Sequence, residues 1–513
     1  MTNKLFKTLS FSYILLPIII FFLGWLKLWL AIPLCIALLI IFLRIINNEQ
    51  SEQLLTRRLS FQDLFPVIAI ILLWVYFSGI GGLIFQNKDH WWRNEIFNLL
   101  VMEHWPVISG DRGLIYYIGF WLPSAVIGKI FGFNAGYLFQ ILWTTLGIFL
   151  VWCLMCDHLS QISLKPLLGL ILFSGLDIVG CLLLQVDFAS LEHFMHIEWW
   201  SGFQFSSFTT QLFWVFNQAI YAWVLTLLIM RQKSNRYIIL IWSCGLLTCT
   251  LPFVGMLPFL LYKIYVNARD AQDSNSISAT VFSKKQPLER QASSTKSNPK
   301  NIYQRICYFC RGSQLFTLEN IIGGGCIGII CFLYEIGNIS ANNSGNPIHY
   351  TKGYLFLYIL FLIIEVGLYA FVIYPYQKQN TLYWLCLIVL AACPLIHIGS
   401  DQDFCMRASI PALLVFMLLF FDSWEKAKAE CNRLIYVGCL VLFLLGAVTP
   451  LCEIWRTTKN TVDCIILAKP LWLLPSVKRK SWTIQTFLGM WMKVSFLNIW
   501  GDDNKYKRVH SLL

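Results

Sequence analysis

The chain has 513 residues, of which 57% are hydrophobic and only 13% are charged. A water-soluble fold of this length could not cover its surface with so little polar material, so the composition excludes an ordinary globular cytosolic protein. The net charge of +12 might suggest nucleic acid, but the basic residues lie in short segments between apolar runs, where the bias of membrane orientation explains them. We therefore expect membrane lipids around the chain and no nucleic-acid partner.

Apolar stretches follow one another from the N-terminus to residue 451. Because backbone groups in hydrocarbon must be satisfied within the segment, runs of about 20 apolar residues indicate helices. The predicted fold is all-α, a polytopic transmembrane helical bundle of about 10 to 13 spans with external loops and juxtamembrane helices. The stretches lie at 9–26, 28–46, 64–85, 114–155, 166–185, 207–230, 237–265, 317–336, 354–376, 381–399, 408–422 and 434–451.

Two of these stretches are long enough for two helices each. Gly132 lies among the glycines that interrupt 114–155, and Pro252 and Gly255 interrupt 237–265. Glycine and proline break helices, and irregular backbone at membrane depth is tolerated where protein surrounds it. We expect broken or re-entrant elements at both places.

Lysine and arginine between the spans orient the chain, since they favour the cytoplasmic side. The pattern places 86–113, 186–206 and 397–407 outside and predicts a multi-pass protein of a bacterial cytoplasmic (inner) membrane. Five segments result: an N-terminal hairpin with its cytoplasmic loop (1–60), a module with two external loops (61–265), a flexible basic cytoplasmic loop (266–315), C-terminal transmembrane helices (316–451) and an external tail (452–513).

The first external loop gathers acidic, basic and aromatic residues just after a span, in the order N-K-D-H-W-W-R-N-E. Asp89 at the membrane edge is suited to accept a proton from a sugar hydroxyl or to hold a divalent cation, and Arg93 is suited to face a phosphate. His90 lies between them. The competing interpretation is an interfacial aromatic belt with a solvated Asp89–Arg93 pair.

The second external loop carries Glu198, followed by Trp199 and Trp200 and by a helix start rich in amide and hydroxyl groups, a combination suited to sugar. His193 and His196 stand three residues apart, so they are candidates to bind a metal together with Glu198. The alternative is a solvated loop with interfacial aromatic residues.

The third external loop places Asp401, Asp403 and Arg407 between two spans. Arg407 is suited to clamp a lipid-linked phosphate, and pairing with Asp403 is the equal alternative. Asp177 and Glu365 lie inside apolar runs, where a carboxyl group is costly, so both should face a cavity or a partner.

The order of features over residues 60–235 resembles the N-terminal module of GT-C type membrane glycosyltransferases. A span, an external acidic loop with Asp89 and the aromatic stretch Y-Y-I-G-F-W-L-P-S-A-V-I-G-K-I-F-G precede a further span. The resemblance implies a polyprenyl-phosphate sugar donor and chemistry on the external face. It implies no specific cofactor, although Mg or Mn is the candidate cation. Two apolar runs precede the loop here, and no tandem acidic pair stands at position 89.

The leading hypothesis is transfer of a sugar from a lipid-phosphate donor to a glycan, lipid or protein acceptor. The catalytic candidates are Asp89 and Glu198, and the substrate-binding candidates are His90, Arg93, Trp199, Trp200, Asp403 and Arg407. Alternatives are a polysaccharide polymerase or ligase of the O-antigen type, a transporter or lipid flippase, and a purely structural membrane protein. The external location of the charged clusters favours an interfacial reaction over alternating access.

Overall fold

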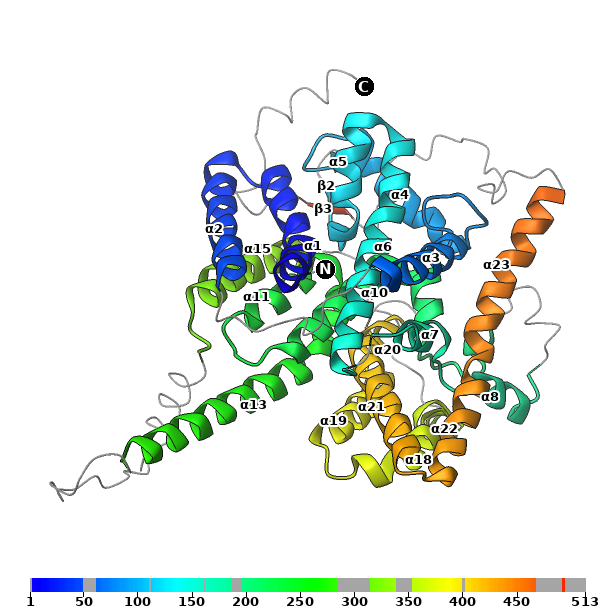
Figure 1. Cartoon of the computed structure of the whole chain (residues 1–513). Coiled ribbons are helices and arrows are strands. Elements are labelled where there is room, and N and C mark those ends of the chain that lie inside the picture. Colours follow the sequence, from blue (N-terminus) through cyan, green and yellow to red (C-terminus); the bar gives the residue numbers. More distant parts are fainter. Residues whose placement is uncertain are drawn as a thin grey trace.

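The computed structural model is a bundle of helices, which confirms the all-α prediction (Figure 1). It describes residues 2–48, 61–109, 112–160, 162–186, 196–283, 314–337, 353–398, 402–466 and 491–493. Within these ranges, eight helical segments are long and apolar enough to cross a membrane. They are Asn3–Trp25, Leu28–Asn47, Phe133–His158, Lys165–Leu183, Phe208–Arg231, Thr250–Ala271, Tyr354–Gln377 and Arg433–Ile466. Shorter apolar helices lie at Leu64–Phe77, Leu122–Phe131, Ile238–Thr248 and Thr381–Leu395.

The N-terminal half contains two strands and most of the long helices. Its elements are α1 (Asn3–Trp25), α2 (Leu28–Asn47), α3 (Phe61–Phe77), α4 (Lys88–Met102), β1 (Ile108–Ser109), β2 (Arg112–Leu114), η1 (Ile118–Phe120), α5 (Leu122–Phe131), α6 (Phe133–His158), α7 (Lys165–Leu172), α8 (Asp177–Leu183), η2 (Ile197–Trp199), α10 (Phe208–Arg231), α11 (Ile238–Ser243), α12 (Gly245–Thr248) and α13 (Thr250–Ser283).

The C-terminal half consists of shorter helical pieces. They are η3 (Glu319–Gly324), α15 (Gly325–Glu335), α17 (Tyr354–Leu362), η4 (Ile363–Gly367), α18 (Leu368–Gln377), α19 (Thr381–Ala392), η5 (Cys393–Leu395), α20 (Asp403–Ala408), α21 (Ile410–Ala429), α22 (Arg433–Gly446), α23 (Val448–Ile466) and the strand β3 (Trp491–Lys493). The segments η3 and η4 are π-helical.

The chain bends where the sequence supplies breakers. Gly132 adopts a φ of 89° between α5 and α6, a region that glycine reaches without a steric penalty. Cys249, with φ −152° and ψ 65°, separates α12 from α13. A third break, between Phe173 and Leu176, divides the membrane-spanning segment Lys165–Leu183 into α7 and α8.

Helix α10 is the centre of the bundle, because every residue of its most apolar window is buried. It packs against α6, α7, α13, α21 and α23. Its buried residues include aromatic and aliphatic side chains around the whole circumference and also polar ones such as Asn217 and Gln218, which lipid would not accommodate. Its first turn and the loop before it therefore hold their side chains inside the protein.

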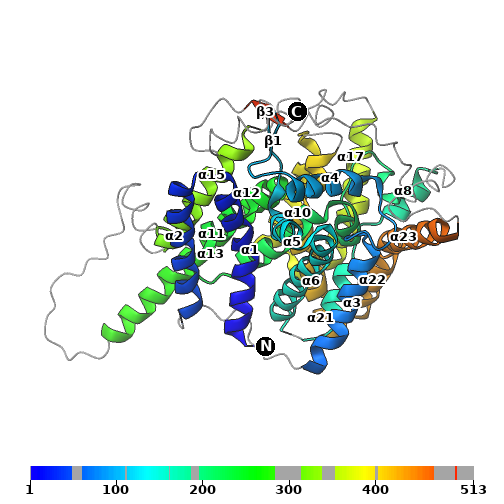
Figure 2. The same cartoon turned by 90° about the horizontal axis from the view of Figure 1, so that it is seen from above.

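Two of the segments predicted to be external, the 86–113 loop and residues 491–493, lie together at one edge of the molecule (Figure 2). β2 pairs with β1 and with β3, so residues 491–493 lie beside the loop that contains 112–114. In Figure 2 these strands lie near α4, and the N-terminus lies at the opposite edge. This separation is the one that a cytoplasmic N-terminus and an external 86–113 loop require.

Candidate functional site

Helix α4 begins in the first of the loops predicted to be external, where Asn87 caps it. The Asn87 side chain accepts a hydrogen bond from the Asp89 backbone N–H at 3.0 Å. Asp89 stands in the first turn, where the helix dipole favours a negative charge. The same helix turn presents Asp89 and Arg93 on one face, four residues apart.

Asp89 and Arg93 form an ion pair, with Oδ2 and Nη1 3.1 Å apart. The Asp89 side chain is 33% exposed, whereas the Arg93 side chain is 6% exposed. Arg93 Nε donates to Asn217 Oδ1 at 3.1 Å, and the guanidinium lies 5.9 Å from the centre of the Phe216 ring. Arg93 is thus held from α10, and Asp89 remains the accessible member of the pair.

Asp403 and Arg407 repeat this arrangement on α20. Asp403 Oδ1 lies 3.0 Å from Arg407 Nη2, and Arg407 Nη1 donates to the Tyr117 hydroxyl at 3.3 Å. Arg407 Nε is buried and has no hydrogen-bond partner among the described residues. Arg407 therefore forms the predicted ion pair with Asp403 and still has its Nε–H available for a phosphate. Asp401 lies outside the described residues.

The two ion pairs converge on Tyr116 and Tyr117, whose ring centres are 3.7 Å apart. Burial raises the pKa of both hydroxyls, and the charges of Arg93 and Arg407 oppose this rise at each of them. Arg407 also lies within electrostatic reach of Asp89. We name these residues the arginine–tyrosine cluster: Asp89, Arg93, Tyr116, Tyr117, Asp403 and Arg407. Three segments far apart in the sequence contribute to it.

His90 lies inside the fold and contacts protein through both ring nitrogens. Nε2 lies 3.0 Å from the Phe213 carbonyl oxygen and Nδ1 lies 3.4 Å from Gln86 Nε2. Burial, and then the nearby Arg93, lower the pKa of His90 to about 4. The imidazole is therefore neutral near pH 7, with the proton on Nε2 as the assignment that satisfies both contacts.

Glu198 is fully enclosed by donors from its own loop and from α10. It accepts hydrogen bonds from Gln204 Nε2 at 2.7 Å, from the Ser207 backbone N–H at 2.9 Å and from Thr210 Oγ1 at 2.6 Å. Burial raises its pKa to about 7, against the lowering influence of His196. These contacts hold the 196–206 loop against the start of α10.

His196 joins Glu198 to a residue that the sequence analysis did not single out. Its Nδ1 lies 2.8 Å from Glu453 Oε1, and its Nε2 lies 3.9 Å from Glu198 Oε2. Glu453 also pairs with Arg456 and accepts a hydrogen bond from Trp214 Nε1 at 3.0 Å. The boundary predicted at 452 falls inside α23, which packs against α10 and continues to Ile466. The sequence did contain a signal for this pair, because an acidic and a basic residue, Glu453 and Arg456, stand three positions apart in an amphipathic segment.

Trp199 and Trp200 point in different directions. Trp199 is 43% exposed, donates to Gln204 Oε1 at 3.2 Å, and has Lys88 Nζ 5.6 Å from its ring centre. Trp200 is buried and donates to Glu365 Oε1 at 3.2 Å. Since Lys88 precedes Asp89, Trp199 connects the second loop to the arginine–tyrosine cluster, and Trp200 connects it to the membrane-spanning helices.

The described residues contain no group of three or more histidine, cysteine, aspartate or glutamate side chains arranged to hold a metal ion. His193, half of the histidine pair weighed as a metal site, lies outside those residues. The described residues therefore do not form a metal centre. The divalent cation stays a prediction, and the reaction proposed below does not use one.

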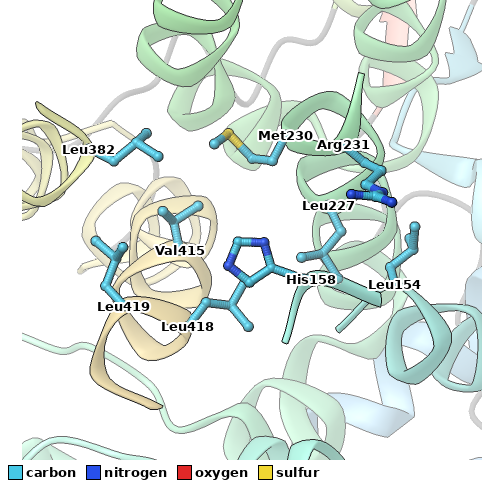
Figure 3. Close-up of a pocket in the computed structure, with 9 residues that line it drawn as sticks. All are labelled: Leu154, His158, Leu227, Met230, Arg231, Leu382, Val415, Leu418 and Leu419. Atoms are coloured by element: carbon cyan, nitrogen blue, oxygen red, sulfur yellow. The ribbon is translucent and has the colours of Figure 1, made fainter. Parts of the chain in front are cut away.

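A separate pocket lies at the other end of α10. Figure 3 shows His158 and Arg231 among apolar side chains from α6, α10, α19 and α21. Arg231 is paired there with Asp157. Because α10 is 24 residues long and a helix rises about 1.5 Å per residue, this pocket is well separated from Thr210 and Glu198. It contains none of the predicted site residues.

Comparison with known proteins adds no family assignment. No protein-family model, no curated protein and no solved structure matches this chain.

Proposed function

We propose that the protein transfers a sugar from a polyprenyl-phosphate donor to a glycan, lipid or protein acceptor at the external face of the membrane. The observation that carries the proposal is the arginine–tyrosine cluster, in which two ion pairs from α4 and α20 meet around two half-buried tyrosines. Arginine binds phosphate through charge-assisted hydrogen bonds, and tyrosine rings pack against sugars and prenyl chains.

The phosphate would be held by Arg407 and Arg93. Arg407 has one buried donor, Nε, without a partner among the described residues, and each arginine has one carboxylate neighbour that an incoming phosphate can replace. Such a replacement keeps the buried guanidinium groups neutralised, which an apolar ligand would not do. Without a donor, the two arginines and two aspartates of the cluster balance each other and its net charge is zero. Binding of the donor phosphate makes the net charge negative.

Asp89 would then act as the general base. Its carboxylate is the accessible one of the pair, and once Arg93 faces the phosphate, Oδ2 is available to the acceptor. The acceptor oxygen forms a bond to the anomeric carbon while the bond from that carbon to the phosphate oxygen breaks. The phosphate leaves with the electron pair, and the hydroxyl proton moves to Asp89. Arg93 and Arg407 stabilise the charge that develops on the leaving phosphate.

Glu198, the second predicted catalytic acid, has a supporting position in this proposal. Its carboxyl group accepts three hydrogen bonds and is 1% exposed, so it shapes the loop that carries Trp199 beside Lys88. The exposed Trp199 ring offers a flat surface for an acceptor sugar.

The direct test is release of polyprenyl phosphate from polyprenyl-phosphate sugars by the purified protein in lipid vesicles. This readout is independent of the identity of the acceptor, because every productive transfer frees the same lipid. A panel of donor sugars with lipid and glycan acceptors should yield release that requires the protein. Absence of release across the panel, together with no binding of polyprenyl phosphate, would contradict the proposal.

A further inference from the structure

Two backbone irregularities face each other within the membrane-spanning part of the bundle. The span Lys165–Leu183 is interrupted between Phe173 and Leu176, and the span Tyr354–Gln377 contains the π-helix η4 at Ile363–Gly367. There is no room for a Cβ atom between Gly175 and Glu365 Oε2, so the break and the π-helix are in direct contact. Broken helices and π-bulges at membrane depth accompany binding sites, because regular helices would leave no polar surface there.

The contact brings together two carboxyl groups. Asp177 opens α8 and Glu365 lies at the middle of its span, and the two are within hydrogen-bonding reach of each other. Asp177 Oδ2 accepts from Ser174 Oγ at 3.2 Å and from Thr449 Oγ1 at 2.8 Å. Glu365 Oε1 accepts from Trp200 Nε1 at 3.2 Å, whereas its Oε2 is buried with no hydrogen-bond donor among the described residues.

The surroundings of this carboxyl pair supply no positive charge in contact with it. In the described part of the chain, neither Asp177 nor Glu365 forms an ion pair with lysine, arginine or histidine. The titratable groups that face the pair from neighbouring elements are His196, Glu198, Tyr369 and the thiols of Cys181, Cys405 and Cys452. His196 and Arg456 are both engaged by Glu453.

Two ionised carboxylates in contact would repel each other strongly in a medium of low polarity. The cost of an unpaired charge at membrane depth adds to that repulsion. A single proton between the two groups removes one charge and also supplies the donor that Glu365 Oε2 lacks, as in other carboxyl dyads that titrate as one unit.

We propose that Asp177 and Glu365 form an intramembrane proton-binding site that holds one shared proton at neutral and mildly alkaline pH. A small crevice adjoins the site, lined by Ser174, Gly175, Ser206 and Glu365 among phenylalanine side chains. Trp200 links the pair to the external loop that carries Glu198 and Trp199. The proton site depends on this geometry alone and would exist whichever reaction the arginine–tyrosine cluster performs.

Infrared difference spectroscopy of the purified full-length protein tests the proposal, because a protonated carboxyl group has its own carbonyl band. The measurement compares the wild type with Glu365→Gln and with the double variant Asp177→Asn/Glu365→Gln, which keep the size of the side chains. It is made about two pH units above the pKa of about 7 of Glu198, so that Glu198 is ionised. We expect the wild type to show the band of one protonated carboxyl group that both variants lack.

Glu198→Gln is the matched control, since it removes another buried carboxyl group of the same region and should leave the band unchanged at that pH. Gel filtration and circular dichroism confirm that each variant keeps the fold. A wild-type spectrum identical to that of the double variant would overturn the proposal, because the pair would then carry no proton. A difference equivalent to two protonated groups would overturn the shared proton as well.

Discussion

Arg93 on α4 donates its Nε–H to Asn217 Oδ1 on α10 at 3.1 Å. This hydrogen bond connects α4 to the buried centre of the bundle. It also fixes the guanidinium in the orientation from which Nη1 reaches Asp89. Asn217 is therefore a positioning residue for Arg93.

Asn217→Leu should lower the free energy of unfolding by about 1 to 3 kcal/mol, because a buried donor of a charged group loses its acceptor. The next residue in α10 provides a matched control. Gln218 is equally buried, and neither polar atom of its side chain has a hydrogen-bond partner among the described residues. Gln218→Leu should therefore be neutral or stabilising. Thermal unfolding of both variants in detergent measures the difference, and equal losses would show that Asn217 does not support Arg93.

The buried His90 should make the protein less stable in acid. Its pKa is lowered from 6.5 to about 4, mainly by burial, so below pH 6.5 the unfolded chain binds a proton that the folded protein does not. Stability therefore falls as the pH decreases from 6.5 towards 4, by about 3 kcal/mol in total for this group. In His90→Gln this part of the pH dependence should disappear. Denaturant unfolding at a series of pH values tests it, and parallel profiles for the two proteins would contradict it.

Much of the fold could be predicted because lipid imposes a simple pattern on sequence. The apolar runs, the break at Gly132 and the interruption near Pro252 all follow from the cost of unsatisfied backbone groups in hydrocarbon. The same reasoning singled out Asp177 and Glu365 as carboxyl groups in need of a partner. This reasoning could not predict that Asp177 and Glu365 are partners of each other. They lie on different helices, and only the packing of those helices brings them together.

The candidate site was predictable only in part for the same reason. Asp89 with Arg93, and Asp403 with Arg407, are neighbours on one helix turn and can be read from a spacing of four residues. Their meeting at Tyr116 and Tyr117 depends on how distant segments pack. Glu453 was missed because the hydrophobic pattern weakens after residue 451, although α23 continues to Ile466 and buries that side chain.

The orientation of the chain predicts different accessibility for two cysteine positions. Cys431 is exposed at the turn between α21 and α22, beside the basic residues that should face the cytoplasm, and a Glu103→Cys variant would place a thiol in the predicted external loop. In intact cells a membrane-impermeant thiol reagent should label position 103 and leave Cys431 unlabelled until the membrane is opened. Native Cys307 and Cys310 are replaced by serine beforehand. Labelling of both positions from outside would remove the basis for an external site.

Arg407→Ala should weaken binding of polyprenyl phosphate by about 1.5 to 3 kcal/mol, the size of a lost hydrogen bond to a charged group. The structural reason is that Arg407 Nε is buried and has no partner among the described residues, next to the tyrosine pair. Arg433→Ala, which removes an exposed arginine at the start of α22, is the control and should bind normally. Ligand-induced thermal stabilisation over a range of lipid concentrations gives the dissociation constants. Unchanged affinity in Arg407→Ala would assign this residue to the Asp403 ion pair alone.

Asp89→Asn should reduce transfer by about 100-fold or more with normal membrane insertion, because a general base cannot act without its negative charge. The substitution keeps the size of the side chain and leaves the Asn87 cap of α4 in place. The simpler possibility is that Asp89 only pairs with Arg93, and an exposed pair contributes roughly 0 to 1 kcal/mol.

Asp422→Asn is the matched control, since Asp422 forms the same four-residue pair with Lys426 at 2.7 Å on α21. Release of polyprenyl phosphate by the purified variants distinguishes the two roles. Wild-type turnover by Asp89→Asn would remove Asp89 from the mechanism and favour the transporter alternative, whereas loss in Asp89→Asn with normal turnover in Asp422→Asn would assign the base.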